Sequence, residues 1–153
     1  MKIELIKEED KRNYLELLLL ADEQEDMIDK YLWRGELFAL YDGGLRAVCV
    51  VTDEGGGVFE IKNLAVEPRF QRRGYGRQMM EFVCGRYGGR CRKILVGTGE
   101  SPLTIPFYRS CGFQESHRVK DFFIDNYDHP MFEKGVRLKD MIYLERNFLT
   151  AED

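Results

Sequence analysis

A basic, glycine-containing turn at residues 69–77 carries the residue types that bind anions in proteins. Gly74 and Gly76 allow the backbone to approach a ligand closely. Positive charge comes from four arginines: Arg69, Arg72, Arg73 and Arg77. A strand-like stretch precedes the turn at residues 59–66, and apolar residues follow it at helical spacing. Because the first N–H groups of a helix lack intrahelical partners and lie at its positive end, this turn is predicted to bind phosphate.

The spacing of the glycines excludes the two common nucleotide-binding motifs. A dinucleotide fingerprint requires a third glycine three residues after Gly76, and Met79 occupies that position. No glycine is followed at the Walker spacing by Gly-Lys-Ser/Thr. What remains is the pattern Val-x-Pro-x-x-Gln-x-x-Gly-x-Gly, formed by Val66, Pro68, Gln71, Gly74 and Gly76. The alternative interpretation is a basic helix cap with flexible glycines.

This pattern resembles the pyrophosphate loop of the GNAT superfamily of acetyl-CoA-dependent N-acetyltransferases. A second motif, Phe107-Tyr108-x-x-x-Gly112-Phe113, is similar to the closing signature of that family. Downstream, the pattern Asn-Tyr-x-x-Pro-x-x-Glu-x-Gly within residues 122–141 resembles one bacterial branch of it. The resemblance covers nearly the whole chain. It implies an enzyme that transfers the acetyl group of acetyl-CoA to a primary amine by direct attack in a ternary complex.

Periodicity and turn signals predict the elements that must position these residues. Strands are expected at 2–6, 36–41, 45–52, 58–66, 94–96, 113–119 and about 136–147. Helices are expected at 14–19 and 22–33, from the glycine turn to Gly88, and from Thr104 to Gly112. This order resembles the GNAT fold. It implies a single α/β domain over residues 1–153 with a mixed, mostly antiparallel central sheet flanked by helices.

The resemblance also assigns contacts to acetyl-CoA. The pyrophosphate is expected on the turn, at Gln71, Arg72, Arg73, Gly74, Tyr75, Gly76 and Arg77. The pantetheine arm is expected along the strand at Leu64, Ala65 and Val66, in a gap where that strand splays from the one at 94–97. A backbone N–H near Leu64 or Ala65 would then face the thioester oxygen.

The loop before the tyrosine helix departs from the family pattern. Many relatives place a cofactor-binding asparagine there, and Ser101 stands at the usual distance before Tyr108. Ser101 is therefore the expected, weaker substitute for the asparagine. Glu100 would oppose a bound polyphosphate if it pointed inward.

Tyr108 matches the tyrosine that many family members use as general acid. Its reference pKa near 10 keeps a phenol protonated at neutral pH, so it can donate a proton to a departing thiolate. The alternative is a packing role, which is common for a buried tyrosine at a helix end.

Glu60 is the candidate general base, since some relatives carry an acidic residue at or near this position. Strand periodicity places Glu60 on one face with Lys62, Leu64 and Val66. The alternatives are a surface ion pair with Lys62 or Arg46, and proton removal from the amine through ordered water.

Length and composition fit one soluble globular domain, with 153 residues of which 44% are hydrophobic and 33% charged. A net charge of −4 argues against a nucleic-acid partner. The longest apolar run, at 17–21, is too short to span a membrane, and the first residues lack a signal-peptide pattern. We therefore expect a cytoplasmic protein with no membrane partner.

Cysteine and histidine spacings form no metal motif, so no metal is expected. Cys111 is close in sequence to Tyr108, which makes a nucleophilic role conceivable, but no histidine partner is apparent nearby. The cysteines are interpreted as reduced, mostly packed thiols.

The expected acceptor is a small cationic amine, such as a polyamine, amino sugar or amino-acid derivative, with a protein lysine or N-terminus as the alternative. Aromatic and acidic residues at 120–134 would suit an amine, or would form a self-packed loop or a homodimer contact. The acidic run at 22–29 is interpreted as a solvated helix face. The rivals to an enzyme are a non-catalytic acyl-CoA-binding or regulatory module and a protein-interaction domain.

Overall fold

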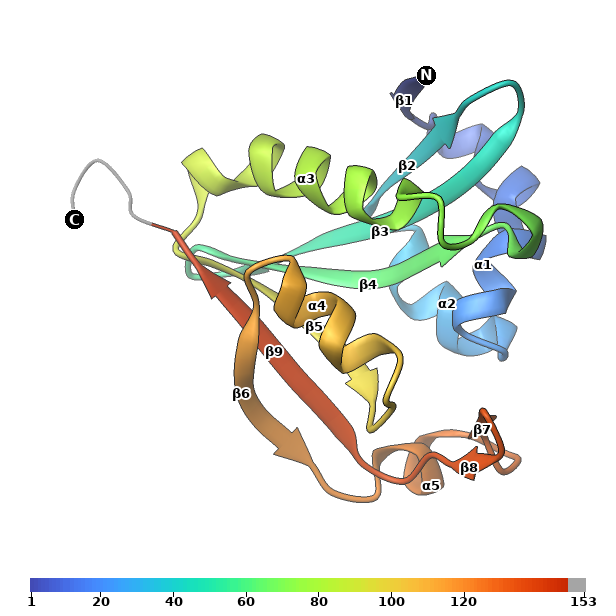
Figure 1. Cartoon of the computed structure of the whole chain (residues 1–153), viewed down its shortest axis with the longest axis vertical. Helices are drawn as coiled ribbons and strands as arrows, with labels where there is room; N and C mark the ends of the chain where they lie inside the picture. The colour runs from blue at the N-terminus through green and yellow to red at the C-terminus, as the bar shows by residue number, and fades with distance from the viewer. Residues whose placement is uncertain (149–153) are drawn as a thin grey trace.

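A seven-stranded sheet with helices on both faces forms the centre of the molecule, as Figure 1 shows for residues 1–148, which the computed structural model describes. The strands are β1 (Lys2–Leu5), β2 (Glu36–Tyr41), β3 (Leu45–Gly55), β4 (Val58–Val66), β5 (Lys93–Gly99), β6 (Gln114–Val119) and β9 (Met141–Asn147). Their order is β1-β2-β3-β4-β5-β9-β6. Every neighbouring pair is antiparallel except β4 and β5, which are parallel. The expected mixed, mostly antiparallel sheet is confirmed.

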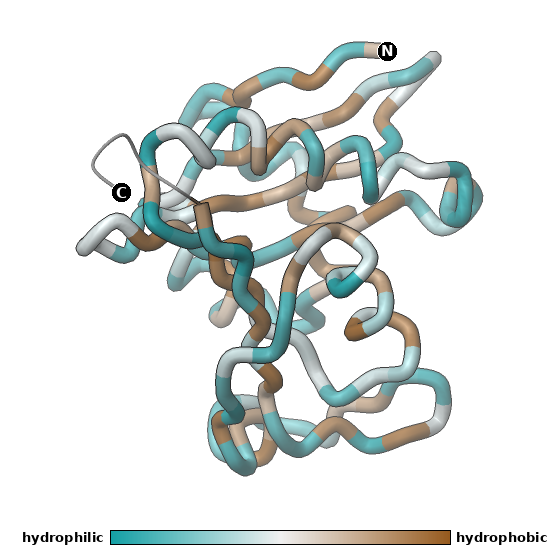
Figure 2. Tube along the Cα trace, turned by 60° about the vertical axis from the view of Figure 1, so that its left-hand side comes forward, coloured by the Kyte–Doolittle hydropathy of each residue, from teal (hydrophilic) through white to brown (hydrophobic). Residues whose placement is uncertain are grey.

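Two apolar clusters hold the helices on the sheet. On one face, which we call the α1–α2 face, α1 (Leu15–Ala21) and α2 (Glu25–Leu32) pack on Val48 and Val50 of β3. On the opposite face, the α3–α4 face, α3 (Tyr75–Tyr87) and α4 (Thr104–Ser110) pack on Cys49 and Ile94. In Figure 2 the hydrophobic segments run along the central strands and the hydrophilic ones gather in the outer loops. Alternate strand residues therefore serve two separate cores.

A β-bulge interrupts β4 in the middle of its pairing with β3. Ile61 is opposite Val51, whereas Asn63 is opposite Val50, so Lys62 is the extra residue. Because one extra residue reverses the alternation, Glu60 lies on the α1–α2 face while Leu64 and Val66 lie on the α3–α4 face. The predicted common face of Glu60, Leu64 and Val66 is therefore wrong.

The sheet splits between its two parallel strands. Pairing of β4 with β5 runs from Val58 opposite Lys93 to Ile61 opposite Val96, and it stops there. Beyond these residues the two strands diverge in Figure 1, while β5 continues in full pairing with β9. The expected splay is present, and it begins at the bulge of β4.

The predicted final strand at 136–147 is wrong in its extent. Its first residues form β8 (Val136–Arg137), which pairs with β7 (Phe132–Glu133) in a separate hairpin. The residues between β8 and β9 bond to the chain before them: Leu138 N–H donates to the Met131 carbonyl, and the Lys139 carbonyl accepts from Phe123 in α5 (Phe122–Asn126). These bonds replace a strand ladder, and sequence periodicity carries no sign of them.

Candidate active site

The phosphate turn presents a row of free backbone donors at the start of α3. Gly74 is the residue before the helix and has a left-handed φ of 88°, and Arg72 is also left-handed with φ 64°. The first helical bond runs from the Gln78 N–H to the Gly74 carbonyl. Within residues 1–148, no N–H group of residues 72–77 donates to another protein atom. Unpaired donors at the positive end of a helix favour an anion.

Side chains around the turn divide into those that hold it and those that remain exposed. Gln71 donates its amide to the Val66 carbonyl at 3.2 Å, and Arg77 donates to the carbonyl and hydroxyl oxygens of Ser110 in α4. The Tyr75 hydroxyl donates to Asp42 at 2.6 Å. Arg72 and Arg73 are exposed, and Arg73 lies over the ring of Phe70. Hence Arg72 and Arg73 are the turn arginines best placed to meet phosphate oxygens.

The stretch Leu64–Val66 follows the point where β4 leaves β5. Its residues pair with β3 on one edge, and none pairs with β5 on the other. Ala65 is buried on the α1–α2 face, and Leu64 and Val66 pack toward the opposite face. An unpaired strand edge of this kind suits an extended, amide-containing ligand such as a pantetheine arm.

Tyr108 lies in α4 on the same face as the phosphate turn. A Cβ on Gly76 would lie 3.3 Å from Phe107, the neighbour of Tyr108, which places α4 against the beginning of α3. The ring packs edge-on against Phe107 and Phe113, and only 7% of the residue is exposed. Among residues 1–148 its hydroxyl has no hydrogen-bond partner. Burial raises the pKa of Tyr108, and neighbouring Cys49, Cys111 and Glu133 act in the same direction.

Glu60 occupies the opposite face, just before the bulge. It is 8% exposed and forms an ion pair with Lys62 at 2.9 Å, as one of the alternatives proposed. Arg46, the other proposed partner, instead stacks over Phe70 at 3.6 Å. Burial and the charge of Glu60 raise the pKa of Tyr143 in β9 to about 12. Glu60 and Tyr108 thus approach the splayed strands from the two faces of the sheet.

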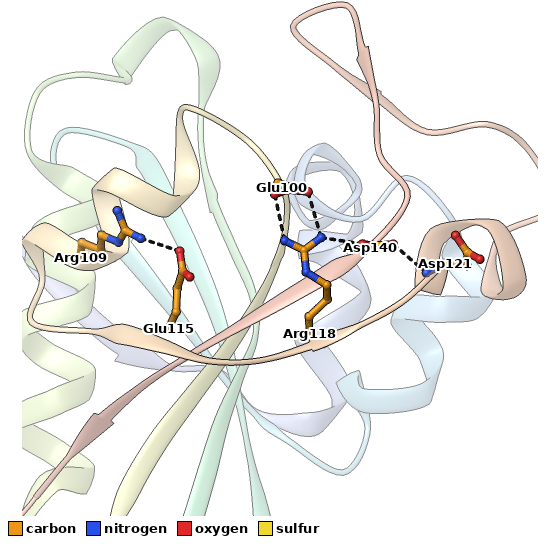
Figure 3. Close-up of polar contacts among 6 residues, drawn as sticks. All are labelled: Glu100, Arg109, Glu115, Arg118, Asp121 and Asp140. Atoms are coloured by element: carbon orange, nitrogen blue, oxygen red, sulfur yellow. Dashed lines mark hydrogen bonds and ion pairs between the residues drawn. The ribbon is translucent and has the colours of Figure 1, made fainter.

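In the loop before α4, the polar side chains of Ser101 and Glu100 both have partners outside the phosphate turn. The buried Ser101 hydroxyl accepts a hydrogen bond from the Leu103 N–H at 3.1 Å, so its oxygen already has a partner within the loop. Glu100 points instead to Arg118 of β6, with N–O distances of 3.0 and 3.1 Å, and Arg118 also binds Asp140 at 2.6 Å (Figure 3). The Glu100 carboxylate is therefore neutralised and does not oppose a bound polyphosphate.

Sequence reasoning missed a buried polar chain on the α1–α2 face. Asp22 accepts hydrogen bonds from Tyr31 and Tyr127, and Asn63 donates to Tyr31. Asp22 is therefore not part of a solvated helix face, although Glu25 is exposed and pairs with Arg12. Asn63 in an apolar strand was the one available signal, since an unpartnered amide is rarely placed in a sheet core.

Residues 1–148 give little support to a metal site or to a cysteine nucleophile. No three His, Cys, Asp or Glu side chains gather there as a metal-binding group. Burial raises the pKa of the half-buried Cys111 thiol, which opposes the thiolate that a nucleophile requires. No helix in that part of the chain is long and apolar enough to cross a membrane.

Together, this fold and site define an acetyl-CoA-dependent N-acetyltransferase. Residues 33–115 match the family model described as an acetyltransferase (GNAT) domain, and the chain belongs to this family.

Three relatives span nearly the whole chain. The uncharacterized N-acetyltransferase YvbK of Bacillus subtilis (strain 168) is 35% identical to this chain over 147 residues, which are 94% of each chain. The structure of a Bacillus subtilis acetyltransferase in complex with CoA superposes with a TM-score of 0.89 at 34% identity, covering 97% of this chain and 99% of that one. The structure of a GNAT family acetyltransferase from Elizabethkingia anophelis with acetyl-CoA bound also superposes with a TM-score of 0.89. It is 33% identical, and the match covers 96% of this chain and 97% of that one.

Proposed function

We propose that this protein acetylates a small cationic amine by direct attack of the amine on acetyl-CoA in a ternary complex. The observation that carries the proposal is the row of free N–H donors at residues 72–77 beside an unpaired strand edge and a buried phenol. The CoA and acetyl-CoA bound to two relatives support the same donor here.

The turn and the strand edge would bind the donor. Phosphate oxygens accept from the N–H groups of residues 72–77, with Arg72 and Arg73 adding charge. The pantetheine amides pair with the free edge at Leu64–Val66. A backbone N–H near Leu64 or Ala65 then stabilises the oxyanion that forms when the amine nitrogen attacks the thioester carbon.

The reaction also requires proton transfer to the departing thiolate and from the attacking amine. The C–S bond breaks as the tetrahedral intermediate collapses, and the departing thiolate takes the Tyr108 proton. The second proton that the newly bonded nitrogen must lose then restores the Tyr108 phenol, so the amide, free CoA and the neutral acid are left. The attacking nitrogen begins as an ammonium and loses one proton before the attack. Glu60 takes this proton in our assignment, and ordered water is the alternative because Lys62 competes for the same carboxylate.

Acidic groups near the splay favour a cationic acceptor. The charges of Glu60 and Glu54 help to raise the pKa of Tyr143, and the charge of Glu133 helps to raise that of Tyr108. Glu60 is paired with Lys62 and Glu54 with Arg34, so an arriving ammonium would compete with these cations. An ammonium is drawn to such a region. A protein lysine or N-terminus carries the same charge, and it is the alternative acceptor.

The experiment is a screen of polyamines, amino sugars, amino-acid derivatives and lysine peptides for thiol release from acetyl-CoA. We expect turnover with at least one small amine. Tyr108→Phe should lower kcat by about 10²–10³-fold with little change in the KM for acetyl-CoA. Tyr14→Phe removes a phenol bonded to Tyr41, away from the site, and serves as the control. Binding of acetyl-CoA without turnover on any amine would favour the non-catalytic module instead.

A further inference from the structure

We infer that Asp22 is a positioning residue: it holds residues 121–140, which we call the cover segment, across the split sheet on the face of Glu60, where the amine is proposed to lose its proton. The inference rests on the proposed function, because it concerns how the acceptor amine is bound. It assigns a role to a buried carboxylate that the chemistry above does not use.

The cover segment spans the strands that separate at the split. Near its end, Leu138 lies against β5, where a Cβ on Gly99 would be 2.6 Å from the Leu138 side chain. At its tip, Tyr127 donates to Asp22 at the end of α1 at 2.7 Å. Figure 1 shows α5, β7 and β8 beyond the end of β5 and close to α2. The segment therefore reaches from β5 to the helices that cover β4.

A continuous chain of hydrogen bonds connects the tip to the bulged strand. The other oxygen of Asp22 accepts from the Tyr31 hydroxyl at 3.0 Å. That hydroxyl accepts from the Asn63 amide at 3.0 Å, and the same amide donates to the Leu18 carbonyl. Asn63 is the residue directly after the bulge. The position of the cover segment is thus linked to the part of β4 where the thioester would lie.

Stability alone does not account for this arrangement. Asp22, Tyr31 and Asn63 are each at most 9% exposed, and the side-chain amide oxygen Oδ1 of Asn63 is buried without a partner among the described residues. Burial raises the pKa of Asp22, against the opposing effect of its two phenol donors, Tyr127 and Tyr31. A buried network with an unsatisfied member costs stability compared with apolar packing. Its benefit lies in fixing one position of the cover segment.

The two ends of the cover segment are anchored independently of the tip. The Asp121 N–H donates to Asp140 at 2.8 Å, and Arg118 joins Asp140 to Glu100 (Figure 3). At the tip, the Asp128 N–H donates to Gln24, and His129 and Glu23 form an exposed pair of 3.7 Å, which contributes little. Loss of the Tyr127–Asp22 bond should therefore loosen the tip while the ends stay in place.

Tyr127→Phe tests the inference, because it removes the hydroxyl and keeps the ring stacked on Phe123. We expect the KM for the amine to rise roughly tenfold, as for loss of a hydrogen bond to a charged group. The KM for acetyl-CoA should stay within about twofold, because the phosphate turn is untouched. The matched control is Tyr87→Phe, which breaks a similar buried phenol–carboxylate bond to Glu36 on the α3–α4 face and should leave both KM values unchanged.

Hydrogen exchange of the amides in residues 121–140 gives a readout that needs no activity. Exchange should become faster in Tyr127→Phe and stay native in Tyr87→Phe. Unchanged exchange, or faster exchange with an unchanged amine KM, would overturn the inference alone. A native protein that binds acetyl-CoA but acetylates no amine would instead contradict the proposed function.

Discussion

At the scale of single residues, the environment of Tyr108 keeps its phenol protonated in the resting enzyme at neutral pH. Burial disfavours the charged phenolate, so the folded-state pKa lies above the ordinary value of 10.0. The phenol therefore remains a donor throughout the range in which enzymes are usually assayed.

A pH profile of kcat tests this property. Because the pKa of Tyr108 is raised, kcat should show no alkaline loss from its ionisation up to pH 10, the ordinary value. An alkaline fall below that pH that is present in the native enzyme and absent in Tyr108→Phe would contradict the raised pKa of Tyr108, while still assigning the acid to this residue.

The assignment of Glu60 as the general base predicts a particular dependence of kcat/KM on pH. Glu60→Gln should lower kcat/KM for the amine by roughly tenfold to a hundredfold at pH 7, where the amine is mostly ammonium. The loss should shrink as the pH approaches the pKa of the amine, because the substrate then loses its proton without help. Equal loss at every pH would mean that Glu60 only supports the structure through Lys62.

At the scale of elements, the turn, α3 and α4 could be predicted from the sequence, and the details of β4 could not. Gly74 and Gly76 mark the turn, and α4 begins at Thr104 as expected because Pro106 disfavours an earlier start. The bulge at Lys62 leaves no local signal, since it is set by pairing with β3. For that reason the predicted face of Glu60 was wrong.

The Arg118 cluster predicts how the anchored loops respond to acid. Arg118 lowers the pKa of Glu100 from its ordinary value of 4.5, and the Asp121 N–H together with Arg118 lowers the pKa of Asp140 from 3.8. Depressed folded-state pKa values give stability that is present above those ordinary values and is lost as the pH falls through the folded ones.

Arg118→Met should therefore lower Tm by roughly 2 °C at pH 7, since Arg118 and Glu100 are exposed and only Asp140 is partly buried. Once the pH has fallen below the lowered pKa values of the folded state, the native and variant Tm values should converge. Arg109→Met, which breaks the exposed pair with Glu115 shown in Figure 3, is the control for loss of any surface arginine. A Tm difference that persists in acid would show that Arg118 acts through packing.

At the scale of the whole molecule, the order of strands and helices followed from the sequence because each element has its own periodicity and turn. The structure of the cover segment could not be predicted in this way, because it depends on contacts between residues far apart in the sequence, such as Tyr127 with Asp22. The split of the sheet lies between two groups of candidate site residues. The phosphate turn, Leu64 and Val66 of the unpaired edge, and Tyr108 lie on one face. Glu60 and the Asp22 chain of hydrogen bonds lie on the other.

The measurement that tests the account most directly is calorimetric titration of acetyl-CoA into the native protein and two glutamate variants. Gly74→Glu places a carboxylate among the free N–H donors, where a Cβ would meet no atom within 4 Å. Gly85→Glu makes the same change on α3 in similarly open space, away from the turn. Gly74→Asn, which tolerates a left-handed φ, separates backbone strain from charge.

We predict Kd values below about 100 μM for the native protein and Gly85→Glu, and binding at least about tenfold weaker for Gly74→Glu. Gly74→Asn should lie near the native value, because it adds no charge. Native-like binding by Gly74→Glu, or no binding by the native protein, would contradict the assignment of the turn and with it the proposed mode of acetyl-CoA binding.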